Sequence, residues 1–190
     1  MRHRGTQPLD TPRLHLRRFV PEDAEAMYAG WAQDPEVTRW LRWTPHPDIG
    51  ETRRVLAEWA AAYEQPGTYL WAMERREDAR LIGAITITPT CEPDSPEGWE
   101  PGYCLARAFW GQGYTTEALQ AVMSYFVQFA GVENLYCCHA IDNHASGHVM
   151  QKAGFVYRRE TVYHRFDGSA VPAKLYAWNL RGSASAADKE

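Results

Sequence analysis

The order in which strand-like and helix-like segments follow one another limits this chain to few folds. Segments of alternating hydrophobicity are interleaved with segments in which apolar residues share one helical face. The order is β-α-α-β-β-β-α-β-α-β-β, which predicts an α/β fold with a mixed sheet and helices on both faces. The expected strands are 14–16, 69–74, 81–88, 102–106, 134–141, 155–166 and 173–180, and the expected helices are 21–34, 48–63, 114–129 and 145–152.

Local signals mark several ends of these elements. Asp48 with Glu51 resembles a capping box at the start of the second helix. Gly154 fits the position of a C-terminal helix cap, and the pair 167–168, Asp-Gly, is typical of a hairpin turn. The stretch 92–101 is rich in Pro, Gly and acidic residues, so we expect a loop there.

Length and charge narrow the class of protein. A chain of 190 residues suits one domain, which we expect over 1–181, followed by a disordered tail at 182–190. The net charge of -4 offers no basic face for nucleic acid, and no apolar run is long enough for a membrane span. The first ten residues lack the apolar stretch of a signal peptide, so we expect a cytoplasmic protein. Its four cysteines are then expected to be free thiols, namely Cys91, Cys104, Cys137 and Cys138.

A glycine-bearing turn between the strand at 102–106 and the helix at 114–129 is the most informative segment. Gly111 and Gly113 allow positive φ angles, and the first N–H groups of the helix have no partner within it. Together these features form an anion site suited to phosphate. The segment is neither a Walker loop nor GxGxxG, and a plain strand-to-helix turn is the alternative.

The run from Trp110 to Ala118 resembles the pyrophosphate-binding segment of the GNAT acetyltransferase superfamily. The similarity is greatest to the branch of the ribosomal-protein N-terminal acetyltransferases, the RimJ/RimL-like proteins, in which Trp-Gly-x-Gly-Tyr-x-Thr-Glu-Ala is usual. Gly113 matches the superfamily pattern Gln/Arg-x-x-Gly-x-Gly/Ala, whereas Trp110 and Thr115 depart from it. The resemblance extends over roughly residues 11 to 181 and implies a single-domain, mostly antiparallel GNAT-like sheet.

The resemblance also implies acetyl-CoA as the co-substrate. Backbone amides of 112–116 would hold the pyrophosphate, and the backbone of 103–107 would pair with the pantetheine arm like an added strand. The residues expected to bind coenzyme A are Tyr103, Cys104, Leu105, Arg107, Gly111, Gln112, Gly113, Tyr114, Thr115, Thr116, Asn143 and Ser146.

A second motif, Asn143-x-x-Ser146 followed by Lys-x-Gly-Phe, matches the same branch at the same spacing. An amine attacks a thioester only when neutral, and the departing thiolate benefits from a positioned proton donor. Many superfamily members place a Tyr donor where this chain has Met150, so the resemblance assigns proton donation to Ser146. Asn143 would bond the pantetheine or orient the thioester. The alternatives are that Ser146 caps the helix and that Asn143 forms a turn.

Glu100 is the candidate general base, because the branch often has Glu just before this strand. The alternative is a surface acid in a polar loop. Trp40, Trp43 and His46 lie between the first two helices, where the family has its acceptor site; they either shape that pocket or seal the core. The histidines and cysteines at 137–148 lack a metal-binding spacing, so we expect no metal.

These residues together predict an N-acetyltransferase. The acetyl group would pass from acetyl-CoA to a primary amine, either a protein N-terminus or a small molecule, by direct attack in a ternary complex. Cys137 and Cys138 have no evident base by motif, which disfavours a covalent enzyme intermediate. Loss of the Tyr donor at Met150 leaves an alternative from another class, a catalytically weak coenzyme A-binding sensor. A homodimer is compatible with the family.

Overall fold

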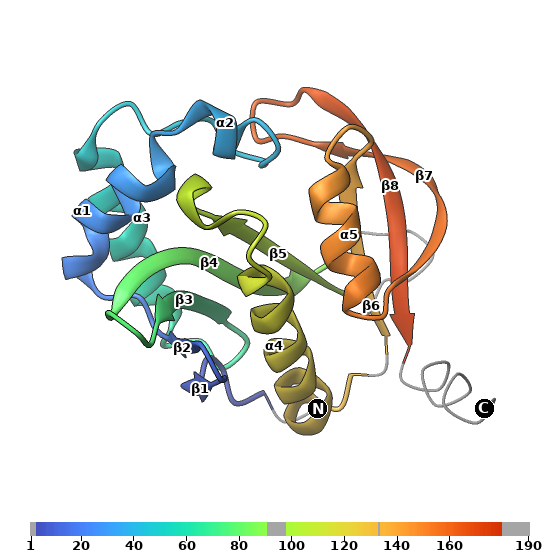
Figure 1. Ribbon diagram of the computed structural model, residues 1–190, viewed down its shortest axis with the longest axis horizontal. Coiled ribbons are helices and arrows are strands. Elements are labelled where there is room, and N and C mark those ends of the chain that lie inside the picture. The colour runs from blue at the N-terminus through green and yellow to red at the C-terminus, as the bar shows by residue number, and fades with distance from the viewer. Residues whose placement is uncertain (1–2, 91–97, 133, 180–190) are drawn as a thin grey trace.

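A twisted eight-stranded sheet forms the centre of the described part of the chain in our computed structural model, which describes residues 3–90, 98–132 and 134–179 (Figure 1). The strand order is β1-β2-β3-β4-β5-β6-β8-β7, and neighbours are antiparallel except for β5 and β6. The predicted mixed, mostly antiparallel sheet is therefore confirmed. The strands are β1 Leu9–Asp10, β2 Leu14–Arg17, β3 Tyr69–Arg75, β4 Arg80–Pro89, β5 Trp99–Leu105, β6 Asn134–Ala140, β7 Val156–His164 and β8 Ala170–Asn179.

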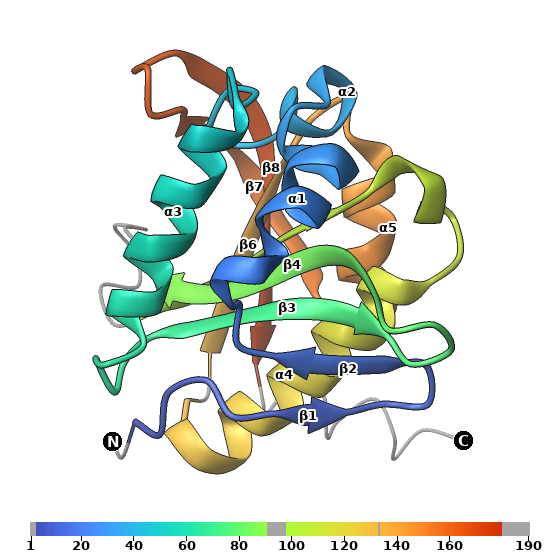
Figure 2. The same cartoon turned by 90° about the vertical axis from the view of Figure 1, so that its left-hand side faces the viewer.

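Helices cover both faces of this sheet, as predicted. The first three lie on one face and the last two on the other (Figures 1 and 2). Within the described residues, no helix is both long and apolar enough to cross a membrane. The α-helices are α1 Ala24–Met27, α2 Pro35–Thr38, α3 Ile49–Ala62, α4 Tyr114–Ala130 and α5 His144–Lys152.

Most of the end signals in the sequence act as expected. The Asp48 carboxylate accepts from the N–H of Glu51 and begins α3, but the Glu51 side chain pairs with Arg54, so only half of the predicted capping box forms. Gly154 follows α5 with a φ of +91°, and Gly168 turns the β7–β8 hairpin with a φ of +85°. L-residues with side chains rarely adopt these left-handed angles, so both elements end where glycine stands.

Three expectations need correction. The first predicted helix is broken into a 3₁₀ turn at Pro21–Asp23, α1, and a π turn at Tyr28–Ala32. β1 and α2 were not predicted. β5 begins at Trp99, so the end of the predicted loop at 92–101 is strand; residues 92–97 of that loop, like Cys91 and the tail at 182–190, lie outside the described residues.

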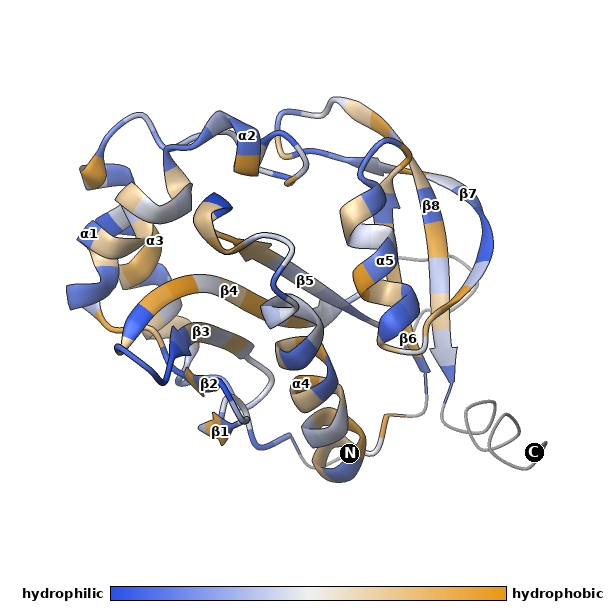
Figure 3. Cartoon of the chain, viewed as in Figure 1, coloured by the Kyte–Doolittle hydropathy of each residue, from blue (hydrophilic) through white to orange (hydrophobic). Residues whose placement is uncertain are grey.

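The buried residues form a larger and a smaller apolar cluster. The larger cluster contains an aromatic group in which Tyr69, Trp99 and Phe126 meet edge to face, with ring centroids 4.7–5.9 Å apart. The smaller cluster contains Tyr163 from β7 and the half-buried Trp40. Figure 3 shows the corresponding pattern, with hydrophobic residues along β4 and a more hydrophilic β7 at the edge. β6 contributes to both clusters, with Leu135 and Cys137 in the larger one and Ala140 in the smaller one.

Candidate active site

A gap between β5 and β6 is the main feature of the sheet. Trp99 and Leu135 form the one register pair recorded between these strands in the described residues, whereas β4 pairs with β5 along its length. Beyond that pair, the carbonyl of Pro101 accepts from Sγ of Cys137 at 3.2 Å. The nitrogen of Pro101 faces the same side and carries no proton, so β5 has no donor for β6 there. The strands therefore part directly after Trp99.

A hydrogen bond joins the two walls of this gap. The hydroxyl of Tyr103 on β5 lies 2.9 Å from Oγ of Ser146 on α5 and 3.2 Å from the Ser146 carbonyl oxygen. Burial raises the pKa of Tyr103 well above its ordinary value. The phenol is therefore a neutral hydrogen-bonding group at neutral pH.

The start of α5 shows what Asn143 and Ser146 do locally. Oδ1 of Asn143 accepts from the N–H of Ser146 at 3.3 Å, so Asn143 is the N-cap. Ser146 does not cap the helix, and its hydroxyl faces Tyr103. Met150, one turn further on, is buried in the larger apolar cluster.

The glycine turn opens the N-terminus of α4. Gly111 and Gly113 have φ angles of +74° and +81°, and Gly113 is the N-cap. The N–H of Glu117 bonds the Gly113 carbonyl at 3.1 Å, so the N–H groups of 114–116 precede the helical ladder. Residues 111–113 are exposed, whereas the side chains of Tyr114 and Thr115 are buried. An anion at this turn would therefore meet backbone amides rather than side chains.

Arg13 and Glu117 brace this turn, and neither was assigned a role from the sequence. Arg13 donates from Nη1 to the Gln112 carbonyl at 2.9 Å and from Nε to Glu117 at 2.7 Å. Thr11 also donates to the Glu117 carboxylate, at 2.6 Å. Burial alone would raise the pKa of Glu117, but these donors outweigh it and lower the pKa. The carboxylate thus fixes the β1–β2 turn against the first turn of α4.

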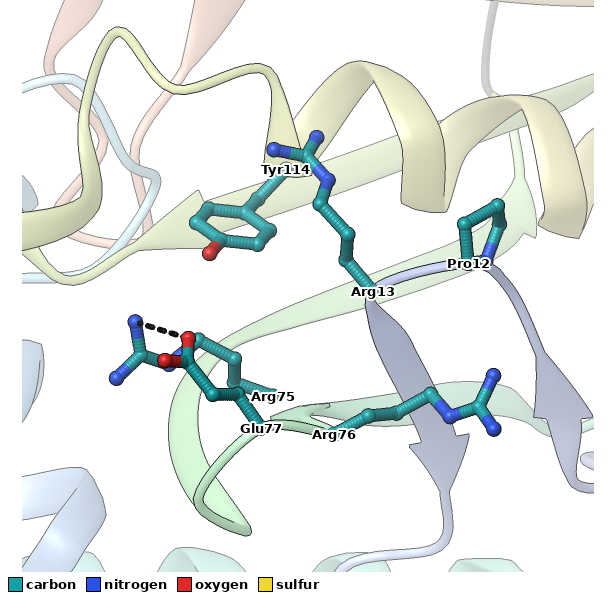
Figure 4. A pocket seen from close by; sticks show the side chains of 6 residues that line it. All are labelled: Pro12, Arg13, Arg75, Arg76, Glu77 and Tyr114. Carbon is teal, nitrogen blue, oxygen red and sulfur yellow. Dashed lines mark ion pairs between the residues drawn. The ribbon is translucent and has the colours of Figure 1, made fainter.

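A basic cavity of about 390 Å³ lies beside the braced turn (Figure 4). The guanidinium of Arg13 stacks on the Tyr114 ring at 4.3 Å, and Arg75 pairs with Glu77 at 3.4 Å. The cavity adds positive charge next to the glycine turn. Its lining residues are Pro12, Arg13, Arg75, Arg76, Glu77 and Tyr114.

The remaining residues expected to bind coenzyme A lie around the end of β5. The Leu105 carbonyl accepts from Nε1 of Trp110 at 2.7 Å, which places the indole against the strand end. Arg107 pairs with Asp34 at 3.1 Å, so its charge is engaged by the α2 region. Burial raises the pKa of Cys104 to about 12, so its thiol stays protonated.

Glu100 is linked to its surroundings through both carboxylate oxygens. Nη2 of Arg42 lies 3.3 Å from Oε2, and Sγ of Cys138 donates to Oε1 at 3.3 Å. The Glu100 side chain is 22% exposed. Glu100, the candidate general base, is therefore a half-buried carboxylate at the point where β5 and β6 part, and not the surface acid of the alternative interpretation.

The three aromatic residues expected at the acceptor pocket do not form one cluster. Trp43 packs against the larger apolar cluster and lies 5.1 Å from the His46 ring. The His46 ring is buried, with Nδ1 2.8 Å from the Thr52 hydroxyl, and burial lowers its pKa. Trp40 packs against the smaller cluster. His46 thus joins the loop to α3, and Trp40 joins it to β7.

The histidines and cysteines at 137–148 bond to protein groups of the fold. Nδ1 of His139 lies 2.8 Å from the Ala140 carbonyl, and burial lowers the pKa of this ring. Cys137 and Cys138 donate to Pro101 and Glu100 as described above. Among the residues that the structure describes, no group of three His, Cys, Asp or Glu side chains could hold a metal ion.

Comparison with known proteins agrees with this arrangement. Residues 13–156 match the family model of the acetyltransferase (GNAT) domain. The uncharacterized N-acetyltransferase YoaA of Bacillus subtilis is 31% identical over 172 residues, which cover 89% of this chain and 94% of YoaA.

Solved structures share the fold at low sequence identity. RimL, a ribosomal L7/L12 alpha-N-protein acetyltransferase in complex with coenzyme A, has a TM-score of 0.77 at 18% identity and covers 92% of this chain and 98% of its own. A GNAT-family acetyltransferase from Bacillus anthracis has a TM-score of 0.75 at 19% identity, with coverage of 91% and 98%. The resemblance read from the two sequence motifs is thus confirmed, and the chain belongs to the GNAT family of N-acetyltransferases.

Proposed function

We propose that this chain transfers an acetyl group from acetyl-CoA to a primary amine by direct attack in a ternary complex. The observation that carries the proposal is the gap between β5 and β6, because Glu100 lies on β5 where the two strands part and Ser146 bonds to Tyr103 further along the same strand. The glycine turn at 111–113 follows the end of β5 after one 3₁₀ turn, Arg107–Phe109. This continuity suits a long ligand with a pyrophosphate at one end and a thioester at the other.

The residues around the gap fit coenzyme A. The open N–H groups at the start of α4 suit a pyrophosphate, and Arg13, Arg75 and Arg76 line the cavity beside them. The edge of β5 that faces the gap has lost β6 as its partner, so backbone groups of 103–105 can bond an extended pantetheine arm. RimL, which shares the fold, is in complex with coenzyme A.

In the proposed reaction, Glu100 and Ser146 handle the two proton transfers. The neutral amine nitrogen attacks the thioester carbonyl, so that a C–N bond forms and the C–S bond breaks. Glu100 accepts the proton of the amine, directly or through water, and Ser146 gives its proton to the departing sulfur. Both residues recover their starting protonation from water. Asn143 positions Ser146 by capping α5.

The acceptor is a primary amine, on a protein N-terminus or on a small molecule. RimL and YoaA are named as N-acetyltransferases, and RimL acts on a ribosomal protein. A second candidate is a coenzyme A-binding sensor without turnover, which is favoured by one observation: the buried Met150 stands where many relatives have a Tyr donor. The two candidates differ in whether thiol is released.

The test has two arms. Acetyl-CoA at about 100 times its Kd should stabilise the fold by about 2.7 kcal/mol in thermal unfolding. Acetyl-CoA with a panel of primary amines should release free thiol, and Ser146→Ala and Glu100→Gln should slow that release while keeping the thermal shift. Ser124→Ala, on the exposed face of α4, is the matched control and should retain both. A thermal shift without amine-dependent thiol release would favour the sensor.

A further inference from the structure

The ion pair between Arg42 and Glu100 is longer than the Arg39–Glu36 pair nearby in sequence. Nη2 and Oε2 are 3.3 Å apart, compared with 2.8 Å between Arg39 and Glu36. Charge-assisted bonds of this type normally measure about 2.7–2.9 Å. The Arg42 side chain is also 40% exposed. Both side chains are therefore partly exposed, so a small solute can reach the two charges from solvent.

Arg42 is nevertheless held in place from behind. Nη1 donates to the His164 carbonyl at 3.1 Å, and the guanidinium lies over the Tyr163 ring, 5.2 Å from its centroid. The backbone carbonyl of Arg42 accepts from the N–H of Phe166 at 2.8 Å. A guanidinium carries five N–H donors, and the bonds to His164 and Glu100 use two of them. Arg42 is thus a fixed cation with spare donors beside the candidate base.

The space around this pair is bounded by two segments that are bonded to each other. The loop after α2 and the β7–β8 hairpin meet at the top of the molecule in Figure 1. Besides the Arg42 bond, the Tyr163 hydroxyl donates to the Trp40 carbonyl at 3.0 Å, and Arg165 donates to the Arg39 carbonyl. These bonds connect the two segments beside Arg42, and on this basis we take the acceptor to be a small molecule.

We infer that Arg42 binds the carboxylate of the acceptor, and that the acceptor is a small α-amino acid whose amine lies at Glu100. This inference rests on the proposed function and narrows its acceptor. An α-amino acid carries an ammonium and a carboxylate on one carbon, and the protein presents a carboxylate and a guanidinium 3.3 Å apart. The planar fork of arginine suits bidentate binding of a carboxylate. Glu100 then receives the amine with its proton, while Arg42 fixes the other end.

The experiment compares each amino acid with its carboxamide, which keeps the amine and removes the negative charge. Rates of thiol release from acetyl-CoA give kcat/KM for both members of each pair. For the preferred side chain we expect the acid to exceed the amide by about 10- to 100-fold. Arg42→Gln should abolish this preference by raising the KM for the acid, with the rate for the amide retained. Arg42→Lys should recover part of the preference, because it keeps the charge but loses the fork.

A matched control and clear contrary results complete the test. Arg39→Gln, three residues earlier and paired with Glu36 at 2.8 Å, should keep the preference for the acid. Three results would each overturn the inference while the proposed function stands. They are equal rates for acid and amide in the unmodified protein, an equal loss for both in Arg42→Gln, and faster acetylation of a peptide N-terminus than of the amino acid. Absence of thiol release with every amine, peptides included, would instead overturn the proposed function.

Discussion

Replacing Tyr103 by Phe removes a single oxygen atom, and the surroundings of that atom determine the effect. The hydroxyl has one proton and two neighbours, the Ser146 carbonyl at 3.2 Å and the Ser146 Oγ at 2.9 Å. The carbonyl can only accept, whereas Oγ can donate or accept. When Tyr103 donates to Oγ, the proton of Ser146 is free to point at the sulfur. The phenol is therefore a positioning group for Ser146 in the proposed mechanism.

The magnitudes follow from this geometry. A buried hydrogen bond contributes about 0.5–1.5 kcal/mol, so Tyr103→Phe should lower the free energy of unfolding by about 1 kcal/mol. That corresponds to a Tm lower by about 2–4 °C for a chain of this size. The loss of orientation should lower kcat about fivefold, since each 1.36 kcal/mol is tenfold in rate. Ser146→Ala should cost less stability, because the phenol keeps the carbonyl as an acceptor.

A double-mutant cycle separates orientation from general loosening. Urea unfolding and thiol release are measured for Tyr103→Phe, Ser146→Ala and the double variant. If the hydroxyls act together, removal of Tyr103 should have little further effect on kcat once Ser146 is Ala, and the stability changes should be non-additive by about 0.5 kcal/mol or more. Strictly additive effects on both quantities would refute the argument.

Three further predictions concern the turn and the buried histidines. Gly113→Ala forces a φ of +81° on an L-residue, which costs about 1–2 kcal/mol. It should therefore weaken acetyl-CoA binding about tenfold in a titration. Gly67→Ala, with open space around it, should leave acetyl-CoA binding unchanged. Glu117→Gln should weaken acetyl-CoA binding and lower the unfolding free energy in urea by about 1–3 kcal/mol, because three hydrogen bonds from Thr11 and Arg13 lose their charged acceptor. Burial lowers the pKa of His46 and of His139, so the unfolded chain binds protons that the folded chain does not. Stability should therefore fall as the pH drops below about 6.5, by up to about 1.4 kcal/mol per pH unit for each ring, and the pH slope in urea unfolding should be flatter in His46→Gln.

Most of the fold could be predicted because its signals come from residues that are close together in sequence. The cap at Asp48, the turn at Gly168 and the period of α4 are local patterns, and each appears in the structure where the sequence places it. β1 and α2 contain two and four residues, which is too short for a period to show. The start of β5 at Trp99 was hidden by the Pro- and Gly-rich composition before it.

The candidate site was predictable only where its residues belong to a local motif. Asn143 and Ser146 were found through their spacing, but the partner of the Ser146 hydroxyl is Tyr103, 43 residues away in sequence. Arg13 is 104 residues from Glu117, and Arg42 is 58 from Glu100. No periodicity or spacing reports such contacts, because they arise when distant strands and loops are brought together.

The alternation of β5 explains how one strand can serve both halves of the proposed reaction. Side chains in a strand point to opposite faces in turn, and Glu100 and Tyr103 are separated by an odd number of positions. Glu100 accordingly meets Arg42 from the loop after α2, whereas Tyr103 meets Ser146 on α5. The amine and the thiol can then enter from opposite faces and meet at the gap where β6 has left β5. This arrangement needs no residue to carry the acetyl group between them, which is why direct attack suits this sheet better than a covalent intermediate on Cys137 or Cys138.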